Sequence, residues 1–186
     1  MKKLDEKVLY AGKWVQLNEM TFAAGNGSTY QWEVVRRRGD ARGVVVVAEL
    51  VPSHRIVLLR QYRQPLENYI IGFPAGLAES DDLEAEALRE LLEETGYYGR
   101  VLEVGPLIRS NPGLMNDGAY TVRAEIDESD PRNSNPRQKL EASEEIEVFL
   151  VPRQEMRSFL FERVARGDDI GMGVWYRFGF EPEAIK

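Results

Sequence analysis

The sequence predicts an α/β fold in which strands and helices are mixed without regular βαβ alternation. Short β-type runs bounded by glycine and proline occur along most of the chain, one amphipathic helical segment lies near the middle, and another lies near the C-terminus. This mixture is typical of an α+β domain or of a mixed sheet between helices. With 186 residues, the chain has room for one domain and a small additional element.

Residues 7–38 predict a set of antiparallel strands. Segments 13–17 and 29–34 flank a glycine-rich turn at 24–28, which is the pattern of a β-hairpin. The aromatic residues of this region are Tyr10, Trp14, Phe22, Tyr30 and Trp32. The region is too short to bury these rings in a core of its own, so we expect another surface to cover them.

We expect a boundary at residues 39–42, Gly-Asp-Ala-Arg, between an N-terminal β element (1–42) and the main domain (43–186). In the main domain, segments 43–50 and 55–62 predict a second and more buried strand pair.

His54, the single histidine, lies in the turn that joins this second pair. We interpret it as a turn residue, because polar residues are common in hairpin turns. The chain has no cysteine, and one histidine excludes a multi-histidine metal site. Acid–base chemistry must then come from carboxylates.

An amphipathic helix is predicted from Asp82 to Thr95. Asp81 is the expected N-cap with Glu84 three residues later, and Gly96 is expected in the left-handed C-terminal position. At about 100° per residue, carboxylates share one face: Glu86, Glu90, Glu93 and Glu94. The opposite, apolar face is expected to hold Ala85, Leu88, Leu91, Leu92 and Thr95.

The rest of the chain predicts further strands and a second helix. The expected elements are strands at 101–109, 119–126 and 146–151, a flexible polar loop at 127–136, a helix at 153–166 that begins with Pro152 and ends at Gly167, and a short helix after Asp169.

The carboxylate face of the central helix predicts a divalent-cation site. Like charges on one helix repel by about 0.2–0.5 kcal/mol per pair, and a bound cation would remove that penalty. Hard oxygen ligands suit Mg²⁺ or Mn²⁺, which also bind phosphate oxygens. The alternative is a solvated helix face. A phosphorylated substrate is the natural partner of such a metal site.

Charge and composition argue against several other functions. The net charge is −7, and the only dense basic run is Arg36-Arg37-Arg38, which we interpret as a solvated strand end or a small phosphate clamp. Nucleic acid is therefore not an expected partner. The chain has no apolar run of membrane-spanning length and no export signal, so we expect no membrane association and a cytoplasmic location.

The run Arg89–Tyr97 resembles the Nudix box, which ends in Arg-Glu, an aliphatic residue, any residue, Glu-Glu, any residue, Gly and an apolar residue. Pro74–Leu77 is similar to the segment that opens this box in the branch of ADP-ribose and nucleoside diphosphate sugar pyrophosphatases. The resemblance implies a Nudix α/β/α sandwich with a mixed sheet from about Gly43 onward, in addition to the N-terminal antiparallel β element.

The chain departs from the family pattern at three places. The spacing from Gly76 to Arg89 is one residue shorter than in the family, either Asp81 or Asp82 stands for an early glutamate, and Gly72 stands where this branch usually has glutamate. The sequence does not determine what the shorter loop and Gly72 change.

The resemblance implies a set of metal ligands, namely the carbonyl of Ala75 and the carboxylates of Glu90, Glu93 and Glu94, with Arg89 orienting the glutamates. Glu93 and Arg89 are thus expected to act in catalysis. The acidic segment 141–145 resembles a loop that supplies a metal ligand or a base in related enzymes. Glu144 is the closest match in this loop, and Glu141 and Glu145 remain alternatives.

Basic side chains are candidates for holding a diphosphate. The run 60–65 resembles a segment near the phosphate site of this branch, so Arg60 or Arg63 is expected there, unless these residues only form a charged strand end. Arg37, in the basic run, is a further candidate.

Aromatic and acidic side chains are candidates for binding the nucleoside. Tyr30 and Trp32 share one strand face and can stack on a base, although core or dimer packing is the alternative. The segment 110–117 resembles the Ser-Pro-Gly loop of the family, in which Asp117 takes an acidic position, and the alternative is a plain turn.

The expected function is a Mg²⁺-dependent pyrophosphatase, with Mn²⁺ possible, that splits the diphosphate bond of ADP-ribose or a related nucleoside diphosphate sugar into nucleoside monophosphate and sugar phosphate. The alternatives are a catalytically silent nucleotide-sugar-binding Nudix module and a decapping-type hydrolase, which the acidic composition disfavours. We also expect a homodimer through the N-terminal β element. The base, the sugar and the number of metals do not follow from the sequence.

Overall fold

The computed structural model describes residues 1–38 and 42–180. The chain divides into two compact units, Met1–Gly43 with Pro106–Tyr120, and Val44–Gly105 with the described residues from Thr121 onward. Of the expected boundary at 39–42, residues 39–41 lie outside the described residues, and the division at residue 42 stays a prediction.

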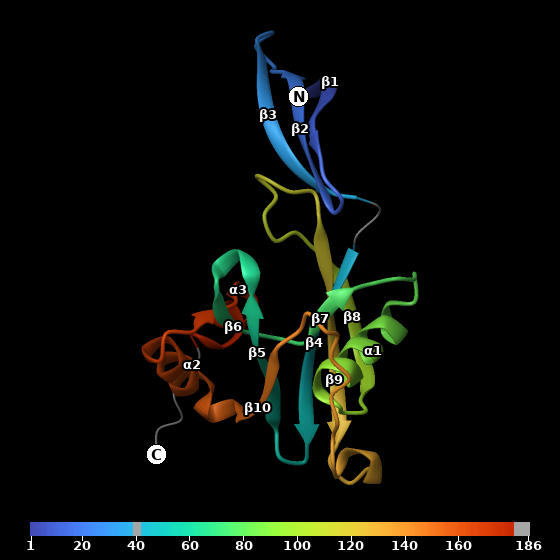
Figure 1. Ribbon diagram of the computed structural model, residues 1–186, viewed down its shortest axis with the longest axis vertical. Coiled ribbons are helices and arrows are strands. Elements are labelled where there is room, and N and C mark those ends of the chain that lie inside the picture. The colour runs from blue at the N-terminus through green and yellow to red at the C-terminus, as the bar shows by residue number, and fades with distance from the viewer. Residues whose placement is uncertain (39–41, 181–186) are drawn as a thin grey trace. The chain divides into compact units, whose positions relative to one another are not determined.

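The first unit is built on three antiparallel strands in the order β1-β2-β3 (Figure 1). Their bounds are β1 (Lys2–Ala11), β2 (Val15–Ala23) and β3 (Thr29–Arg37). The predicted hairpin is β2 and β3, which pair from Val15 with Arg37 to Ala23 with Thr29. The expected start of the strand set at residue 7 is wrong, because β1 already pairs with β2 at Lys2.

A second, eight-stranded sheet has the order β11-β6-β5-β4-β9-β8, with β10 paired to β5 and β7 paired to β4. It is mixed, because β5 runs antiparallel to β6 and β10 whereas β11 runs parallel to β6. The bounds are β4 (Arg42–Val51), β5 (Arg55–Arg63), β6 (Asn68–Gly72), β7 (Ala75–Leu77), β8 (Arg100–Ile108), β9 (Gly118–Asp127), β10 (Ile146–Pro152) and β11 (Asp169–Ile170).

Helices cover both faces of this sheet. Helix α1 (Leu83–Thr95) packs on one face, and α2 (Met156–Ala165) and α3 (Met172–Phe178) pack on the other (Figure 1). Strand β5 shows the physical reason, because alternate residues point to opposite faces. Val57 packs in the α1 core, whereas Ile56 and Leu58 pack in the core of α2 and α3. The predicted α/β/α sandwich and N-terminal antiparallel element are confirmed.

Several local predictions about the helices are corrected. The N-cap of α1 is Asp82 and not Asp81, since the Asp82 carboxylate accepts the backbone N–H of Ala85 at 3.1 Å. On the predicted apolar face, Leu91 and Thr95 are buried as expected, whereas Ala85 is exposed and Ala87, which was not predicted there, is buried. Gly96 ends the helix with φ 79°, as predicted.

The C-terminal half also differs in detail from the prediction. Residues Arg153–Glu155 form a 3-10 turn, so α2 begins at Met156 rather than directly after Pro152. The segment 127–136 contains a 3-10 turn at Pro131–Asn133, and buried Asn133 bonds to the backbone of Tyr98 and Asp127. Strands β6, β7 and β11 were not predicted. Within the described residues, no helix combines the length and apolarity needed to cross a bilayer.

Candidate metal centre and active site

Arg89 organises the carboxylate face of α1. Its guanidinium donates to Glu86 at 2.9 Å, to Glu90 at 2.8 Å and to Glu93 at 2.8 Å. It also donates to the carbonyl of Leu77 at 3.2 Å. The hydrogen bond from Arg89 is the main cause that lowers the pKa of Glu86 to about 2. One cation thus contacts three glutamates of this face.

Glu86, Glu90 and Glu94 are the buried members of this face. Glu94 is 2 % exposed and accepts the backbone N–H of Ala75 at 2.8 Å, and burial raises its pKa to about 8. Burial also raises the pKa of Glu90. A Cβ at position 76 would lie 2.1 Å from Cδ of Glu90, so this close approach requires Gly76. The backbone of Ala75–Gly76 therefore contacts two carboxylates, Glu94 through a hydrogen bond and Glu90 through close packing. We call this segment the backbone seat of the two carboxylates.

These groups line one pocket of about 580 Å³ together with the acidic loop. Of the predicted residues, the pocket collects Arg63, Ala75, Arg89, Glu90, Glu93, Glu94, Glu141 and Glu144. Its ionisable lining is completed by Glu79 and Lys139, which makes six carboxylates against three cations. The excess of negative charge favours a cation in this pocket.

The residues present fit a divalent cation. Burial raises the pKa values of Glu90 and Glu94, and the nearby charge of Glu144 adds to the rise, so these two carboxylates are destabilised as anions. Hard oxygen donors match Mg²⁺ or Mn²⁺. Among the described residues, no three acidic or histidine side chains already stand in a coordinating group. Glu86, Glu90 and Glu93 are instead bound to the Arg89 guanidinium.

The loop that carries Glu144 closes on itself. The Glu144 backbone N–H donates to the carbonyl of Glu141 at 3.1 Å, and the Glu144 carboxylate accepts the Glu141 N–H at 2.9 Å. Glu141 and Glu144 line the pocket, whereas the Glu145 carboxylate accepts a hydrogen bond from the Tyr69 hydroxyl. This arrangement favours Glu144 and Glu141 over Glu145 as the acidic group of the site.

The two candidate arginines of β5 point in different directions. Arg63 lines the pocket, together with Gln61, which the sequence analysis missed. Arg60 lies elsewhere, because its guanidinium donates to Asp168 at 2.9 Å and stacks on the Tyr69 ring at 3.5 Å. The two-residue period of a strand is a signal that separates them, since residues 61 and 63 share one face and residue 60 has the other. Lys139 was also missed, and no local signal marks it.

The candidate nucleoside-binding residues belong to the first unit. Trp32 is half exposed, and its Nε1 donates to the carbonyl of Gly113 at 2.8 Å. Arg37 pairs with Asp117 at 3.3 Å, and within the described chain the Oδ1 atom of Asp117 is buried without a hydrogen bond. Tyr30 stacks on Phe22, with 5.7 Å between ring centres. Trp32 and Arg37 of β3 thus each contact the segment 110–117, Trp32 at Gly113 and Arg37 at Asp117.

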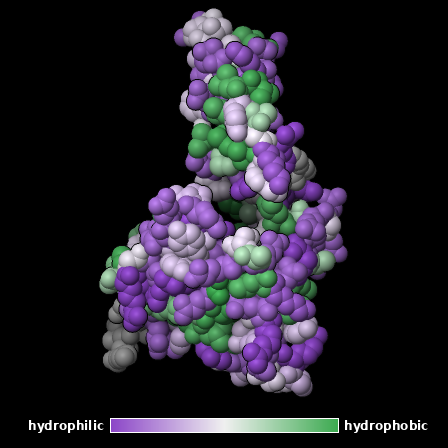
Figure 2. Space-filling model, viewed as in Figure 1, coloured by the Kyte–Doolittle hydropathy of each residue, from purple (hydrophilic) through white to green (hydrophobic). Residues whose placement is uncertain are grey.

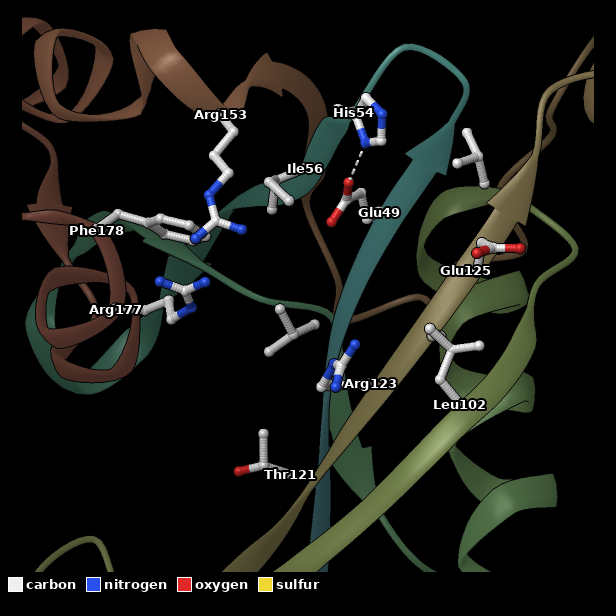
Figure 3. A pocket seen from close by; sticks show the side chains of 13 residues that line it. Glu49, His54, Ile56, Leu102, Thr121, Arg123, Glu125, Arg153, Arg177 and Phe178 are labelled. Carbon is white, nitrogen blue, oxygen red and sulfur yellow. Dashed lines mark hydrogen bonds and ion pairs between the residues drawn. The ribbon is translucent and has the colours of Figure 1, made fainter. Parts of the chain in front are cut away.

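A second pocket, of about 550 Å³, lies on the sheet face opposite α1 (Figure 3). It is lined by Glu49 and His54, and the guanidinium groups of Arg153 and Arg177 point into it beside Phe178. As predicted, His54 lies in the hairpin turn. Its φ is 55°, and its Nδ1 is 2.6 Å from Oε1 of Glu49. None of the α1 glutamates reaches this pocket.

Comparisons with known proteins show which family this chain is similar to. The NUDIX domain family matches residues 39–169. The chain is 36% identical over 159 residues to an ADP-sugar pyrophosphatase of Mus musculus, which covers 81% of this chain and 73% of that protein. It is 34% identical over 161 residues to an ADP-ribose pyrophosphatase of Saccharomyces cerevisiae. That alignment covers 82% of this chain and 68% of the yeast protein.

A solved structure shares the fold. The crystal structure of an ADP compounds hydrolase superposes with a TM-score of 0.70 over 86% of this chain and 82% of that chain, at 21% identity. The backbone seat at Ala75–Gly76, the glutamates of α1 and the NUDIX match over residues 39–169 lead to one assignment. The chain belongs to the Nudix family of hydrolases.

Proposed function

We propose that this protein is a divalent-cation-dependent pyrophosphatase that hydrolyses the P–O–P bond of ADP-ribose or a related nucleoside diphosphate sugar. The products would be a nucleoside monophosphate and a sugar phosphate. The observation that carries the proposal is the pair of buried carboxylates, Glu90 and Glu94, seated on Ala75–Gly76 in a pocket with excess negative charge. The names of the mouse and yeast relatives support the substrate class.

Glu90, Glu93, Glu94 and the Ala75 carbonyl would hold the cation, with Glu144 as a further ligand or as the base. When bound, Mg²⁺ or Mn²⁺ neutralises charge that develops on the diphosphate and lowers the pKa of an attacking water. Arg89 holds the glutamate side chains in position through its contacts with Glu86 and Glu93.

Glu144 is suited to accept a proton because it lines the pocket and is partly exposed to solvent. Its bond to the Glu141 N–H is exposed to solvent and is therefore readily exchanged for a water or a ligand. Arg63 and Lys139 line the same pocket and can bind phosphate oxygens.

The first unit would bind the nucleoside and join two copies of the chain. Trp32 offers an exposed ring for stacking on the base, and Asp117 has a buried oxygen that a ligand hydroxyl can satisfy. We propose a homodimer through β1 to β3, because Tyr10 and Trp14 leave 65% and 72% of their surface exposed. A cytoplasmic location remains a proposal that rests on composition.

The direct test is turnover of ADP-ribose at neutral pH with Mg²⁺ and with Mn²⁺, read by chromatography as AMP and ribose phosphate. We expect activity with either cation, none in excess chelator, and suppression by excess Ca²⁺, whose looser coordination spoils the in-line geometry. A panel of nucleoside diphosphate sugars then ranks base and sugar. Binding of ADP-ribose without any product from the panel would identify a catalytically silent module instead.

A further inference from the structure

A chain of polar contacts leads from the end of α2 to the residue next to Glu144. Asp168 is buried, with 6% exposed, and it accepts hydrogen bonds from Arg163 at 2.6 Å and from Arg60 at 2.9 Å. The Arg60 guanidinium lies 3.5 Å from the centre of the Tyr69 ring. The Tyr69 hydroxyl donates in turn to the carboxylate of Glu145.

The loop 139–145 is held at both ends by contacts of this kind. At its start, the Lys139 N–H donates to the carbonyl of Glu93 at 2.8 Å. At its end, the Tyr62 N–H donates to the carbonyl of Glu145 at 3.2 Å, and Tyr69 holds the Glu145 side chain. Glu144, the proposed base, is therefore next to Glu145, which hydrogen bonds from Tyr62 and Tyr69 hold in place. The start of the loop is held by the hydrogen bond of Lys139 to α1.

We infer that Tyr69 is a positioning residue that, through Glu145, sets the place of Glu144 in the pocket. The inference rests on the proposed function, because it concerns the loop that supplies the base. It also explains Arg60, whose charge serves to orient the Tyr69 ring between Asp168 and Glu145 rather than to meet a phosphate. The hydrogen bond to Glu145 raises the pKa of the Tyr69 hydroxyl.

A positioning role has a specific kinetic signature. Displacement of a catalytic group by about 1 Å lowers the rate of the chemical step by up to about 100-fold. Binding energy from the rest of the substrate is unaffected, so kcat falls while KM stays the same. The loop itself should exchange its amide hydrogens faster once one anchor is lost.

The test uses Tyr69→Phe, which removes the hydroxyl and keeps the ring under Arg60. We expect kcat for ADP-ribose to fall about 10-fold with KM unchanged, and amide exchange in residues 139–146 to accelerate. The matched control is Tyr62→Phe, since the Tyr62 ring packs edge-on against Tyr69, at 5.3 Å between ring centres. That control should change neither kcat nor the exchange of the loop.

Variants of Glu145 separate an anchor from a base. Glu145→Gln keeps an acceptor for the Tyr69 hydroxyl and should retain most of the activity, whereas Glu145→Ala should match Tyr69→Phe. The double variant Tyr69→Phe with Glu145→Ala should show no further loss, because both changes break one contact. Unchanged kcat and unchanged exchange in Tyr69→Phe would overturn the inference, as would a Glu145→Gln variant as inactive as Glu144→Gln.

Failure of the proposed function gives a different result. A wild-type protein that hydrolyses no nucleoside diphosphate sugar would refute that function. The exchange measurement on Tyr69→Phe would still show whether Tyr69 holds the loop, because it needs neither substrate nor metal.

Discussion

The N-terminal sheet exposes aromatic side chains, which are usually buried, whereas the carboxylate face of α1 buries glutamates, which are usually exposed. In the sheet, Trp14 is 72% and Trp32 is 50% exposed, while Asn18 is the one buried side chain among the described residues of that unit. Figure 2 shows hydrophobic atoms on the visible surface of these strands. In α1 the reverse holds, because Glu90 and Glu94 are buried.

The buried polar side chain of the sheet is hydrogen-bonded, whereas its aromatic rings are left exposed. Asn18 donates to Glu6 at 2.5 Å, and Arg36 donates to the same carboxylate at 2.9 Å. Hydrogen bonds from Lys3 and Asn18 lower the pKa of Glu6 to about 2, so that it stays ionised. What this sheet lacks is an apolar surface to cover its rings.

The apolar side chains of α1 are buried in the core, and so are some of its carboxylates. Ala87 and Leu91 are fully buried against β4 and β9, whereas burial raises the pKa values of Glu90 and Glu94. What this helix lacks is positive charge beyond Arg89. The two regions therefore lack different external components, an apolar or aromatic surface in one and a cation in the other.

The largest expected effect concerns the cation. Glu93→Gln and Glu94→Gln should each lower turnover of ADP-ribose by at least about 100-fold, because each removes a proposed ligand. The fold should be retained, since the changes are isosteric. Glu84→Gln is the matched control, because Glu84 is exposed on the first turn of the same helix. Near-normal rates of both variants at saturating Mg²⁺ would refute the metal assignment.

The acidic loop should show a similar loss confined to kcat. Glu144→Gln should lower kcat by about 100-fold or more with little change in KM if the carboxylate is the base. Glu141→Gln should have a smaller effect, because Glu141 is bound to Glu144 chiefly through its backbone. Steady-state kinetics on both variants distinguishes the two residues. A defect of Glu144→Gln in KM alone would indicate a structural loop.

The N-terminal sheet should be needed for association and for nucleotide binding together. Removal of residues 1–38 should convert a dimer to a monomer in sedimentation and weaken ADP-ribose binding. Trp32→Ala is the gentler change and should raise KM about 10-fold, as expected for one lost base-stacking contact. A full-length chain that is monomeric at micromolar concentration with normal activity would contradict the proposed arrangement.

The smallest effect is on stability in the absence of metal. Because the pKa of Glu94 is raised from 4.5 to about 8 in the folded protein, the folded state binds more protons between these pH values. The free energy of unfolding should therefore fall as pH rises from 5 to 8.5. Glu94→Gln should reduce this fall by on the order of 1 kcal/mol or more and be more stable than wild type at pH 8.5.

Urea unfolding in chelator at the two pH values measures this effect, with Glu84→Gln as the control. Equal pH dependence of wild type and Glu94→Gln would show that Glu94 is not strained by burial. Added Mg²⁺ should then stabilise the wild type more than the variant, because the cation binds the folded state.

Local physics made much of the fold and the site predictable. The α1 helix follows from its 3.6-residue period and its caps, and Gly96 adopts the predicted left-handed conformation. Strand β4 follows from its valine-rich run, and β5 follows from its apolar run at 56–59. The cap was placed one residue early at Asp81 because two aspartates precede the helix, and only the contact with the Ala85 N–H selects Asp82.

The short strands and the loops were harder to predict. β7 has three residues and β11 has two, so neither carries a pattern of its own. Their pairing with β4 and β6 depends on contacts with segments far away in the sequence. The segment 127–136 has loop composition, and its order comes from the buried hydrogen bonds of Asn133.

The sequence by itself determined the family, the helix with its row of glutamates and the acidic loop, because these depend on residue type and on spacing within a few turns. The tertiary structure decided which carboxylates are buried, since the burial of Glu90 and Glu94 requires Ala75–Gly76 to lie against them. It also directed Arg63 to the pocket and Arg60 to Asp168. Burial and charge pairing are properties of residues distant in the chain, and only the folded chain brings those residues together.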